Sequence, residues 1–449
     1  MKRVLVVGGG AREHALARAL KNSREEVDLL VFAASRNPGL TSLASKFHPG
    51  SLGDVRAICR FASENKADFA VIGPEGPLAA GLVDALQEIG VPSVGPIKDL
   101  ARLESSKTFT RELLKEFGIP GSPAYQSFSN SEGLEKFLHQ FEDGFVIKPD
   151  GLTGGKGVQV MGDHFFSTSE GMQIVQKLLS EGERVLIEEK LVGQEFSLMS
   201  FCDGQHCLHM PVVQDHKRAF NNDTGPNTGG MGTYSMPDGS MPFLEKSDIQ
   251  AAREINEAVA HALFRKTGKE YKGVLYGGFM ATRTGIRLIE YNARLGDPEA
   301  MNVLSLIPGK EANDVADFLE ICEAIIQGNL NRLKVQWKPL ATVCKYAVPE
   351  GYPDKPIKGI PIDTGDVNQA YASIYYASVE EEQGQLLLAG SRAVAVLAMH
   401  SDVAEAEKLA EAEIQKIHGP VFHRSDIGTE ALIRQKTQMM RAIRSGLVD

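Results

Sequence analysis

Lysine and glycine lie close together in the segment IKPDGLTGGKG, and these residue types suit the binding of nucleotide phosphates. Lys148 belongs to an apolar stretch that predicts a strand, and Lys156 follows a run of glycines. The segment is not the P-loop motif, because Gly157 stands where that motif needs serine or threonine. A glycine loop that carries a lysine can still fold over phosphates. The alternative is a solvated hairpin turn.

Side chains with oxygen atoms are spaced for metal binding in the segment LIEYNAR. Glu290 and Asn292 are separated by one residue, so the period of a strand places both on one face. Magnesium prefers such hard oxygen ligands and usually takes one or two protein groups together with phosphate oxygens. The alternative is the polar face of a half-buried strand.

The segment NNDTGPNTGGMGTYS (221–235) is rich in glycine, asparagine and threonine. Its glycines and proline predict neither a helix nor a good strand. The large apolar side chains of Met231 and Tyr234 argue against a flexible spacer, and the charged run from Asp215 to Arg218 lies just upstream. Exposed backbone N–H groups beside cations predict a loop that holds a small anion. A surface loop or linker is the alternative.

The N-terminal segment GGGAREH, from Gly8 to His14, follows a predicted strand and opens a predicted helix. Backbone N–H groups at a helix N-terminus bind anions. The segment does not match the dinucleotide fingerprint, because Glu13 stands where that motif needs its third glycine. No acidic residue that could bind a ribose follows the second strand either. A single bound phosphate, or a tight turn without a ligand, therefore fits better.

An acidic segment, IEEKLVGQE, ends a predicted strand and places Glu195 shortly after it. A carboxylate can accept both hydroxyls of a ribose, and the backbone at the end of a strand can pair with the edge of an adenine. A solvated acidic edge is the alternative.

Strands and helices alternate over residues 1–100. Apolar runs at Val4–Val7, Asp28–Ala34 and Asp68–Glu75 predict strands, and amphipathic stretches between them predict helices. This order predicts a doubly wound parallel sheet, in which ligands lie beyond the carboxyl ends of the strands. Both GGGAREH and GPEGP lie at such ends.

The rest of the chain mixes helices with strands that are close in sequence. We predict a helix at Ser105–Pro120, strands around Lys148 and Glu188, and a hairpin over Leu275–Arg294 with its turn at Arg283–Gly285. A helix at about 313–327, a strand-rich segment and a tail helix at about 429–445 follow.

Composition limits the class of protein. The chain has 449 residues, 43% hydrophobic and 24% charged, which is ordinary for a globular protein of about three domains. The net charge of −10 argues against nucleic acid as a partner, and no apolar run is long enough for a membrane span. The scattered cysteines form no zinc pattern, so we expect reduced thiols in a cytoplasmic protein.

The order of these motifs is more specific than any one of them. Lys107, Lys148, the loop lysine Lys156, Glu195 and the E-x-N-x-R pattern resemble the ATP-grasp fold. The segments GGGAREHALA, GPEGPLAAG, LESSKTFTRELL, QDHKR, DTGPNTGGMGTYS, IEYNARLGDPE and FHRSDIG together resemble the phosphoribosylamine–glycine ligase family over nearly the whole chain.

The resemblance implies an α/β protein of three domains. Residues 1–104 would form an N-terminal doubly wound (Rossmann-like) domain. Residues 105–328 would form the ATP-grasp domain, with a mobile lid at about 122–190 that includes the loop Thr153–Gly157. Residues 329–449 would form a small strand-rich C-terminal domain.

The family resemblance also implies a reaction. ATP and Mg²⁺ or Mn²⁺ would activate glycine as glycyl phosphate, and 5-phosphoribosylamine would then take the glycyl group to give glycinamide ribonucleotide. No covalent enzyme nucleophile is needed. The partners would be these small molecules, with neither nucleic acid nor membrane, and the protein would be a monomer or weak homodimer.

Site residues follow from the matching motifs. The ATP site would contain Lys107, Lys148, Gly154, Gly155, Lys156, Gly157, Glu188, Glu189, Leu191 and Glu195. The metal ligands would be Glu290 and Asn292. The glycine and transfer site would contain Asp215, Lys217, Arg218, Asn227, Thr228, Gly229, Gly230, Arg294 and Asp297. The phosphoribosylamine site would contain Gly8, Gly9, Gly10, Arg12, Glu13, Gly73, Pro74 and Glu75.

Departures from the family pattern leave other functions to consider. Leu295, Asn302 and the segment 305–314 differ near the expected substrate end. An ATP-grasp ligase for another small acid or amine is one alternative. A nucleotide-binding protein without turnover is disfavoured by the retained lysines and oxygen ligands. A Rossmann-type oxidoreductase is disfavoured by the failed glycine fingerprint.

Overall fold

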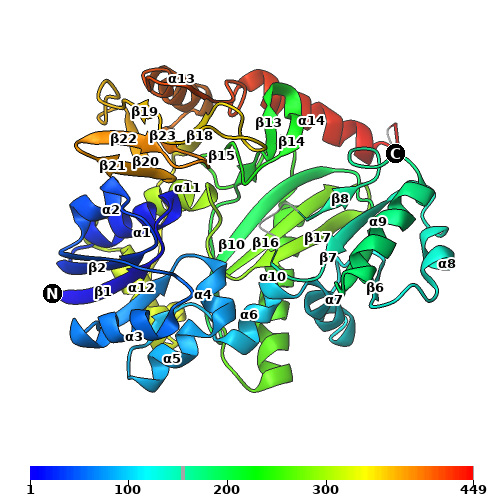
Figure 1. Cartoon of the computed structure of the whole chain (residues 1–449), viewed down its shortest axis with the longest axis horizontal. Coiled ribbons are helices and arrows are strands. Elements are labelled where there is room, and N and C mark those ends of the chain that lie inside the picture. Colours follow the sequence, from blue (N-terminus) through cyan, green and yellow to red (C-terminus); the bar gives the residue numbers. More distant parts are fainter. Residues whose placement is uncertain (153–156, 448–449) are drawn as a thin grey trace.

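A computed structural model describes residues 1–152 and 157–447 of the chain. Figure 1 shows an N-terminal α/β region beside a strand-rich C-terminal region, with the central part of the chain on the opposite side. Within the described residues, no helix is long and apolar enough to cross a membrane.

The N-terminal region is the expected parallel sheet, with strand order β3-β2-β1-β4-β5. Its core strands are continuous apolar runs, and Val4 to Val7 in β1 are fully buried because helices cover both faces. Two helices, α4 and α5, follow β4 and are separated by Gly81, whose φ of 90° is left-handed. The elements are β1 (Lys2–Val7), α1 (Ala11–Lys21), β2 (Val27–Ala33), α2 (Pro38–Leu43), β3 (Lys46–Pro49), α3 (Val55–Glu64), β4 (Phe69–Ile72), α4 (Glu75–Ala80), α5 (Leu82–Glu88), β5 (Ser93–Val94) and α6 (Lys98–Ser105).

Next in the chain comes a four-stranded antiparallel sheet with its own core. Its strand order is β6-β9-β7-β8, and α9 packs on β7 and β9. Phe145, Ile187 and Val175 are fully buried in this core. Ser106 caps α7 through a hydrogen bond to the Phe109 N–H. The elements are α7 (Lys107–Glu116), β6 (Tyr125–Phe128), α8 (Leu134–Leu138), β7 (Phe145–Pro149), β8 (Gln159–Val160), α9 (Thr168–Ser180) and β9 (Val185–Glu189).

A second antiparallel sheet, with order β11-β10-β16-β17, lies against the long helix α10. The predicted hairpin is present, because Thr282 pairs with Gly285 across the turn. The register shifts between Gly278 and Phe279, so Ile289 on β17 is the extra residue of a bulge. The elements are β10 (Gln194–Asp203), β11 (Cys207–His209), α10 (Lys246–Thr267), β16 (Lys272–Thr282), β17 (Gly285–Asn292), α11 (Glu299–Ser305) and α12 (Phe318–Gln327). Helix α12 starts later than predicted because Asp317 is its N-cap.

The glycine-rich segment contains two short strands, so the expectation that it makes a poor strand is wrong. β13 (Arg218–Phe220) pairs with β14 (Thr224–Asn227), which contains the first half of the GPNTGG loop (residues 225–230) and precedes Gly229 and Gly230. β15 (Gly232–Ser235) pairs with β12 (Gln214–Asp215) and with β18 of the C-terminal region. The loop is therefore attached to the C-terminal sheet by hydrogen-bonded strands.

The C-terminal region continues that sheet in the order β12-β15-β18-β23-β20. Helix α13 packs on β18 and β23, and the tail helix α14 begins after the capping Thr429. The elements are β18 (Ala341–Pro349), β19 (Pro361–Ile362), β20 (Ala372–Tyr376), β21 (Val379–Glu382), β22 (Gln385–Leu388), β23 (Val394–His400), α13 (Val403–Ile414), β24 (Val421–Phe422) and α14 (Glu430–Arg444).

Candidate active site

Lys148 lies on β7 and is held by two oxygen atoms. Its Nζ is 2.7 Å from Glu188 Oε2 and donates to the Ile289 carbonyl at 3.0 Å. The bulge in β17 leaves this carbonyl free of the sheet ladder. Arg111 from α7 pairs with the other Glu188 oxygen. Burial opposes ionisation of Glu188, but Arg111 and Lys148 lower the pKa of its carboxyl.

Glu188, which was predicted to belong to the ATP site, has a buried side chain that is turned toward Lys148 and Arg111. Glu189 and Leu191 are half-buried near the strand end, and Glu189 accepts a hydrogen bond from the Ala124 N–H. Of Glu188, Glu189 and Leu191, only the last two have partly exposed side chains.

Lys107 opens α7 and reaches the loop that follows β7. Its Nζ donates to the carbonyls of Pro149 at 3.1 Å and Gly151 at 2.7 Å. Burial lowers the pKa of this lysine. Gly157 is half-buried, whereas the predicted ATP-site residues Gly154, Gly155 and Lys156 lie outside the described residues.

Glu290 and Asn292 are half-buried on β17, and no hydrogen bond within the described part of the chain engages either side chain's polar atoms. Burial disfavours the charged form of Glu290, but Lys217, Lys148 and Lys107 lower the pKa of its carboxyl. Among residues 1–152 and 157–447, no three His, Cys, Asp or Glu side chains converge on one metal position. One carboxylate and one amide oxygen suit a magnesium ion that takes its other ligands from phosphates and water.

Lys217 interacts with both Glu290 and Glu195, the residue that was predicted to bind the ribose. Its Nζ lies 3.2 Å from Glu195 Oε2, and the Glu195 and Glu290 carboxylates raise the pKa of Lys217 despite its burial. The lysine is therefore a permanent cation at neutral pH. Glu195 is exposed near the start of β10, so its carboxylate is accessible from solvent.

The GPNTGG loop folds back on the residues that precede it. The Thr228 N–H and hydroxyl both donate to the Lys217 carbonyl, at 2.7 and 2.8 Å. Gly230 has a φ of 108°, and a Cβ there would approach Asp215 Oδ1 and Pro298 Cδ to 2.7 Å. The position therefore requires glycine for both its backbone angle and its surroundings.

Arg392, which belongs to no sequence motif, connects this loop to the GDPE loop (residues 296–299). Arg392 Nη1 donates to the carbonyls of Gly229 (2.6 Å), Gly230 (3.0 Å) and Asp297 (2.8 Å). Asp297 also accepts a hydrogen bond from the Tyr346 hydroxyl at 2.6 Å. The loops from both ends of the predicted glycine site are thus joined by a residue near the start of β23.

Asp215 is a half-buried acid beside these loops. Burial and the nearby Glu299 raise the pKa of the Asp215 carboxyl well above its usual value. Glu299 in turn accepts a 2.5 Å hydrogen bond from the Tyr276 hydroxyl. Glu299 ends the quoted segment IEYNARLGDPE but is not among the predicted site residues, and Tyr276 belongs to no motif.

Arg218 and Asn227, two further predicted site residues, lie on the β13–β14 hairpin. Arg218 forms an ion pair with Asp163 and donates to the Gly225 carbonyl at 2.9 Å. It is the register partner of Asn227 across the β13–β14 hairpin. Arg218 thus links the hairpin to the turn after β8.

Glu13 fills the turn that was predicted to hold a phosphate. It accepts from the Gly10 N–H at 2.6 Å and from Arg12 Nε at 2.6 Å. A Cβ on Gly73 would lie 2.0 Å from Glu13 Oε1, and one on Gly8 would lie 2.7 Å from the Glu13 side chain. Glycine is required at both positions because Glu13 passes between them. Gly9 and Pro74 flank the same turn, where a Cβ on Gly8 would lie 2.9 Å from Pro74.

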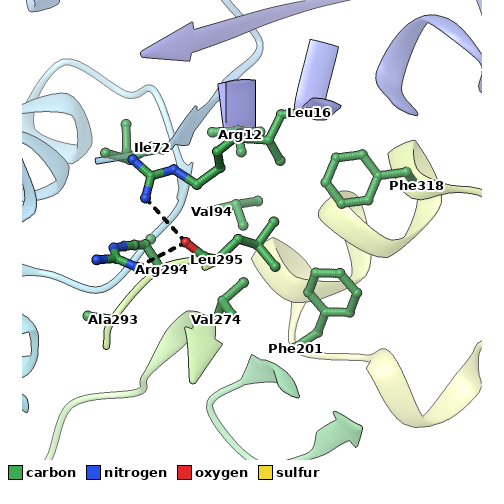
Figure 2. A pocket seen from close by; sticks show the side chains of 13 residues that line it. Arg12, Leu16, Ile72, Val94, Phe201, Val274, Ala293, Arg294, Leu295 and Phe318 are labelled. Carbon is green, nitrogen blue, oxygen red and sulfur yellow. Dashed lines mark hydrogen bonds between the residues drawn. The ribbon is translucent and has the colours of Figure 1, made fainter. Parts of the chain in front are cut away.

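Figure 2 shows Arg12 and Arg294 converging on one carbonyl beneath this turn. Both donate to Leu295 O, at 3.2 and 3.3 Å. Arg294 also pairs with Glu75 at 3.2 Å and with the buried Glu104 at 3.1 Å. Although burial opposes it, Arg294 lowers the pKa of Glu75, while burial raises the pKa of Glu104.

The predicted sites are therefore close to one another. Asp297 Oδ2 lies 3.8 Å from where a Cβ on Gly10 would stand, so the N-terminal turn adjoins the GDPE loop. Arg294, two residues after Asn292, connects the metal strand to Glu75 at the start of α4. The predicted metal strand, the GDPE loop and the N-terminal turn therefore adjoin one another.

Comparison with known proteins identifies the family. Models of the phosphoribosylglycinamide synthetase N domain, ATP-grasp (A) domain and C domain match residues 2–104, 105–300 and 342–430. The phosphoribosylamine–glycine ligase of Methanosarcina acetivorans is 43% identical over 445 residues, which cover 99% of this chain and 98% of that protein. The chain belongs to the phosphoribosylamine–glycine ligase family.

Other members of the family agree with this assignment. The ligase of Methanocaldococcus jannaschii is 45% identical and covers 98% of this chain and 100% of that protein. The crystal structure of the Thermotoga maritima ligase aligns with a TM-score of 0.77 at 29% identity, over 95% of this chain and 100% of that one. The predicted family, three-part α/β fold and enzyme class, an ATP-grasp ligase, are confirmed. ATP is its substrate, and the reaction uses a divalent metal ion.

Proposed function

We propose that this chain joins glycine to 5-phosphoribosylamine, with ATP, to give glycinamide ribonucleotide, ADP and phosphate. The relatives' shared name supports the substrates, since the match extends over nearly the whole chain. The observation that carries the chemistry is the set of cations around Glu290: Lys217, Lys148 and Lys107 all lower the pKa of its carboxyl. Oxygen ligands set among fixed cations suit the transfer of a phosphoryl group between two anions.

In the first step the glycine carboxylate attacks the γ-phosphorus of ATP, and the bond to the ADP oxygen breaks. Both reactants are anions, so fixed positive charges must offset their repulsion. Lys148 and Lys107 are ordered before substrate binds, because carbonyl or carboxylate oxygens hold each of them. Lys156, from the glycine loop, would complete the phosphate contacts with Gly154, Gly155 and Gly157.

Glu290 and Asn292 would hold the metal, and we propose Mg²⁺ as the ion, with Mn²⁺ as a substitute. When bound, the ion neutralises charge on the phosphate oxygens. The residues fit such an ion because both side chains are half-exposed and make no hydrogen bond with other described residues. Glu195 would bind the ribose, and the strand end with Glu189 and Leu191 would line the adenine.

In the second step the amine of phosphoribosylamine attacks the acyl carbon. The C–N bond forms, phosphate leaves, and the amine loses a proton. Glycyl phosphate reacts readily with water, so the site must exclude solvent. The loop Asn227–Gly230, Lys217, Arg294 and Asp297 would surround glycine and its acyl phosphate, with Asp215 behind them.

Phosphoribosylamine would bind at the N-terminal turn, near Gly8–Glu13 and Gly73–Glu75. Glu13 accepts a hydrogen bond from the Gly10 N–H, so a phosphate at this turn would have to replace that contact. The Arg12 guanidinium is the nearest fixed cation of the turn. We also propose that the protein is cytoplasmic and a monomer or weak homodimer, which sedimentation velocity would test.

The test of the function is ADP release with ATP and Mg²⁺, with and without glycine and freshly generated phosphoribosylamine. We expect release to need both, and glycinamide ribonucleotide to be found by mass. ADP release with another acid alone would keep the ATP-grasp chemistry and overturn the substrates. ATP binding without ADP release under any condition would indicate a protein without turnover.

A further inference from the structure

The β13–β14 hairpin is fastened at its tip to the end of the C-terminal region. Asn221 donates to Ser425 Oγ at 2.9 Å, and the Asn222 N–H donates to Asp426 Oδ2 at 2.9 Å. The Phe220 ring lies 5.9 Å from that of Phe422. The hairpin is thus joined by side chains to residues about two hundred positions later.

Arg424 is the centre of this junction, and its side chain is fully buried. It donates to Asp223 Oδ1 at 2.8 Å, to the Arg218 carbonyl at 3.1 Å and to both oxygens of Asp426. The planar guanidinium forms these bonds in fixed directions, which a lysine could not reproduce. Both the tip of the hairpin and its first strand are therefore fixed by one side chain.

The tail helix α14 adds a second cation. Lys436 forms an ion pair with Asp223 Oδ2, the oxygen that Arg424 leaves free. Although burial opposes ionisation, Lys436 lowers the pKa of the Asp223 carboxyl. In Figure 1 the red helix α14 passes close to the β13–β14 hairpin.

The backbone at the tip needs such support. Asn222 and Asp223 have φ values of 61° and 53°, a left-handed conformation that non-glycine residues keep only where their surroundings hold them. The hairpin leads directly into Thr228, whose N–H and hydroxyl fix the Lys217 carbonyl. Movement of the tip would therefore reach the loop that surrounds glycine.

We propose that Arg424 and Lys436 are positioning residues, which hold the GPNTGG loop closed over the acyl phosphate through Asp223. This rests on the proposed function. The C-terminal region and its tail helix then contribute to retention of the intermediate. A loosened loop would admit water, so ATP would be consumed without product.

Lys436→Met tests this, with Arg444→Met as the matched control. Arg444 lies on the same helix and is similarly half-buried, but it pairs with Glu245 and Asp248 near α10 rather than with the hairpin. The ratio of ADP released to glycinamide ribonucleotide formed is measured, with the KM for glycine and for ATP. Hydrogen exchange of residues 218–230 is followed in the same variants.

We expect Lys436→Met to raise the ADP-to-product ratio about twofold or more and the KM for glycine about fivefold, with the KM for ATP little changed, because misplacing a contact by about 1 Å is enough for such losses. Lys436→Arg should restore both values, and Arg444→Met should resemble the wild type. Asp223→Asn should repeat the uncoupling.

Unchanged coupling in Lys436→Met, or equal uncoupling in Arg444→Met, would overturn the positioning role. Failure of the wild type to form glycinamide ribonucleotide would instead overturn the proposed function. In that case hydrogen exchange still decides the inference, since faster exchange of 218–230 in Lys436→Met alone is required by it.

Discussion

Replacing Glu188 by glutamine should destabilise the β7–β9 sheet and weaken ATP binding together. The Glu188 carboxylate lies between Arg111 and Lys148, and the exposed fractions of the three side chains are 4%, 2% and 6%. The variant keeps one acceptor oxygen but loses the negative charge. Two buried cations would then share no carboxylate.

The size of the effect follows from burial. Removing one partner of a buried ion pair costs about 3–5 kcal/mol, and the retained amide oxygen favours the lower end. A loss of about 3 kcal/mol is roughly a hundredfold in the opening equilibrium of this sheet. Glu181→Gln is the control, because Glu181 pairs with Lys177 at 4.0 Å in an exposed pair on the same subdomain. Such pairs contribute about 0–1 kcal/mol.

Hydrogen exchange of β7 and β9 measures the local free energy of opening without assuming that the whole protein unfolds in one step. The effect should also depend on pH. Because the folded-state pKa of Glu188 is lowered, its stabilisation is present above the unfolded value of about 4.3 and is lost as the pH falls through the folded pKa. Equal exchange in both variants at pH 7, or a difference that grows toward acid, would refute the assigned role of Glu188.

Further substitutions test other parts of the site and fold. Glu290→Gln should lower turnover about a hundredfold and raise the metal concentration that turnover requires, since the charge stabilisation by the metal is worth several kcal/mol. A titration of ADP release with the metal measures both effects. Removing the metal with a chelator should stop ADP release without unfolding the chain. Lys156→Ala should reduce turnover while the unfolding midpoint stays near that of the wild type, because the sequence predicts Lys156 in a glycine loop and a lysine outside the core contributes little stability; unchanged turnover would remove it from the mechanism. Glu411→Gln should destabilise the C-terminal region at neutral pH, because Glu411 lies 2.6 Å from the buried Lys345. His423 and Lys345 outweigh burial and lower the pKa of Glu411 to about 2. The stabilisation by this carboxylate is therefore complete above about pH 4.3 and is lost as the pH falls toward 2. Urea unfolding between pH 7 and 3 should show that the difference in unfolding free energy between the variant and the wild type shrinks as the pH falls.

Much of the fold was predictable where local signals and tertiary structure agree. The strand Val4–Val7 is a continuous apolar run because both faces of the parallel sheet are covered. Ser106 and Thr429 are N-caps, so the starts of α7 and α14 could be placed closely. The hairpin turn at Arg283–Gly285 was also correct.

The strands of the glycine-rich segment were not predictable, for a reason that Gly232 illustrates. A Cβ at this position would lie 2.3 Å from the Cys344 carbonyl on β18. The residue must be glycine because another strand's backbone approaches it closely. The same glycine removes the local strand propensity. Its pairing partner lies over a hundred residues away, so no local pattern shows it.

The candidate site likewise contains residues that the sequence indicated and residues that only the structure showed. Lys148 and Glu290 stood out because each belongs to a short motif, and the structure brings both near Ile289 and Lys217. Arg111 and Arg392 were missed, since each acquires its role only when distant segments meet around it. Sequence patterns therefore indicated groups that could contact substrate, while the groups that hold them in place required the structure.

The groups that hold the lysines in place also affect how the site binds ATP. Each described cation that would meet phosphate is already ordered by oxygens: Lys148 by Glu188, Lys217 by Glu195, and Lys107 by two carbonyls. Pairing with a carboxylate reduces the net field but fixes the ammonium group, so binding ATP costs less side-chain entropy. Lys107 is held by neutral carbonyls, so no carboxylate hydrogen-bonded to it offsets its charge toward the phosphates. The catalytic advantage then comes from charges that need not reorganise as the phosphoryl group moves, which is the condition under which electrostatic stabilisation is most effective.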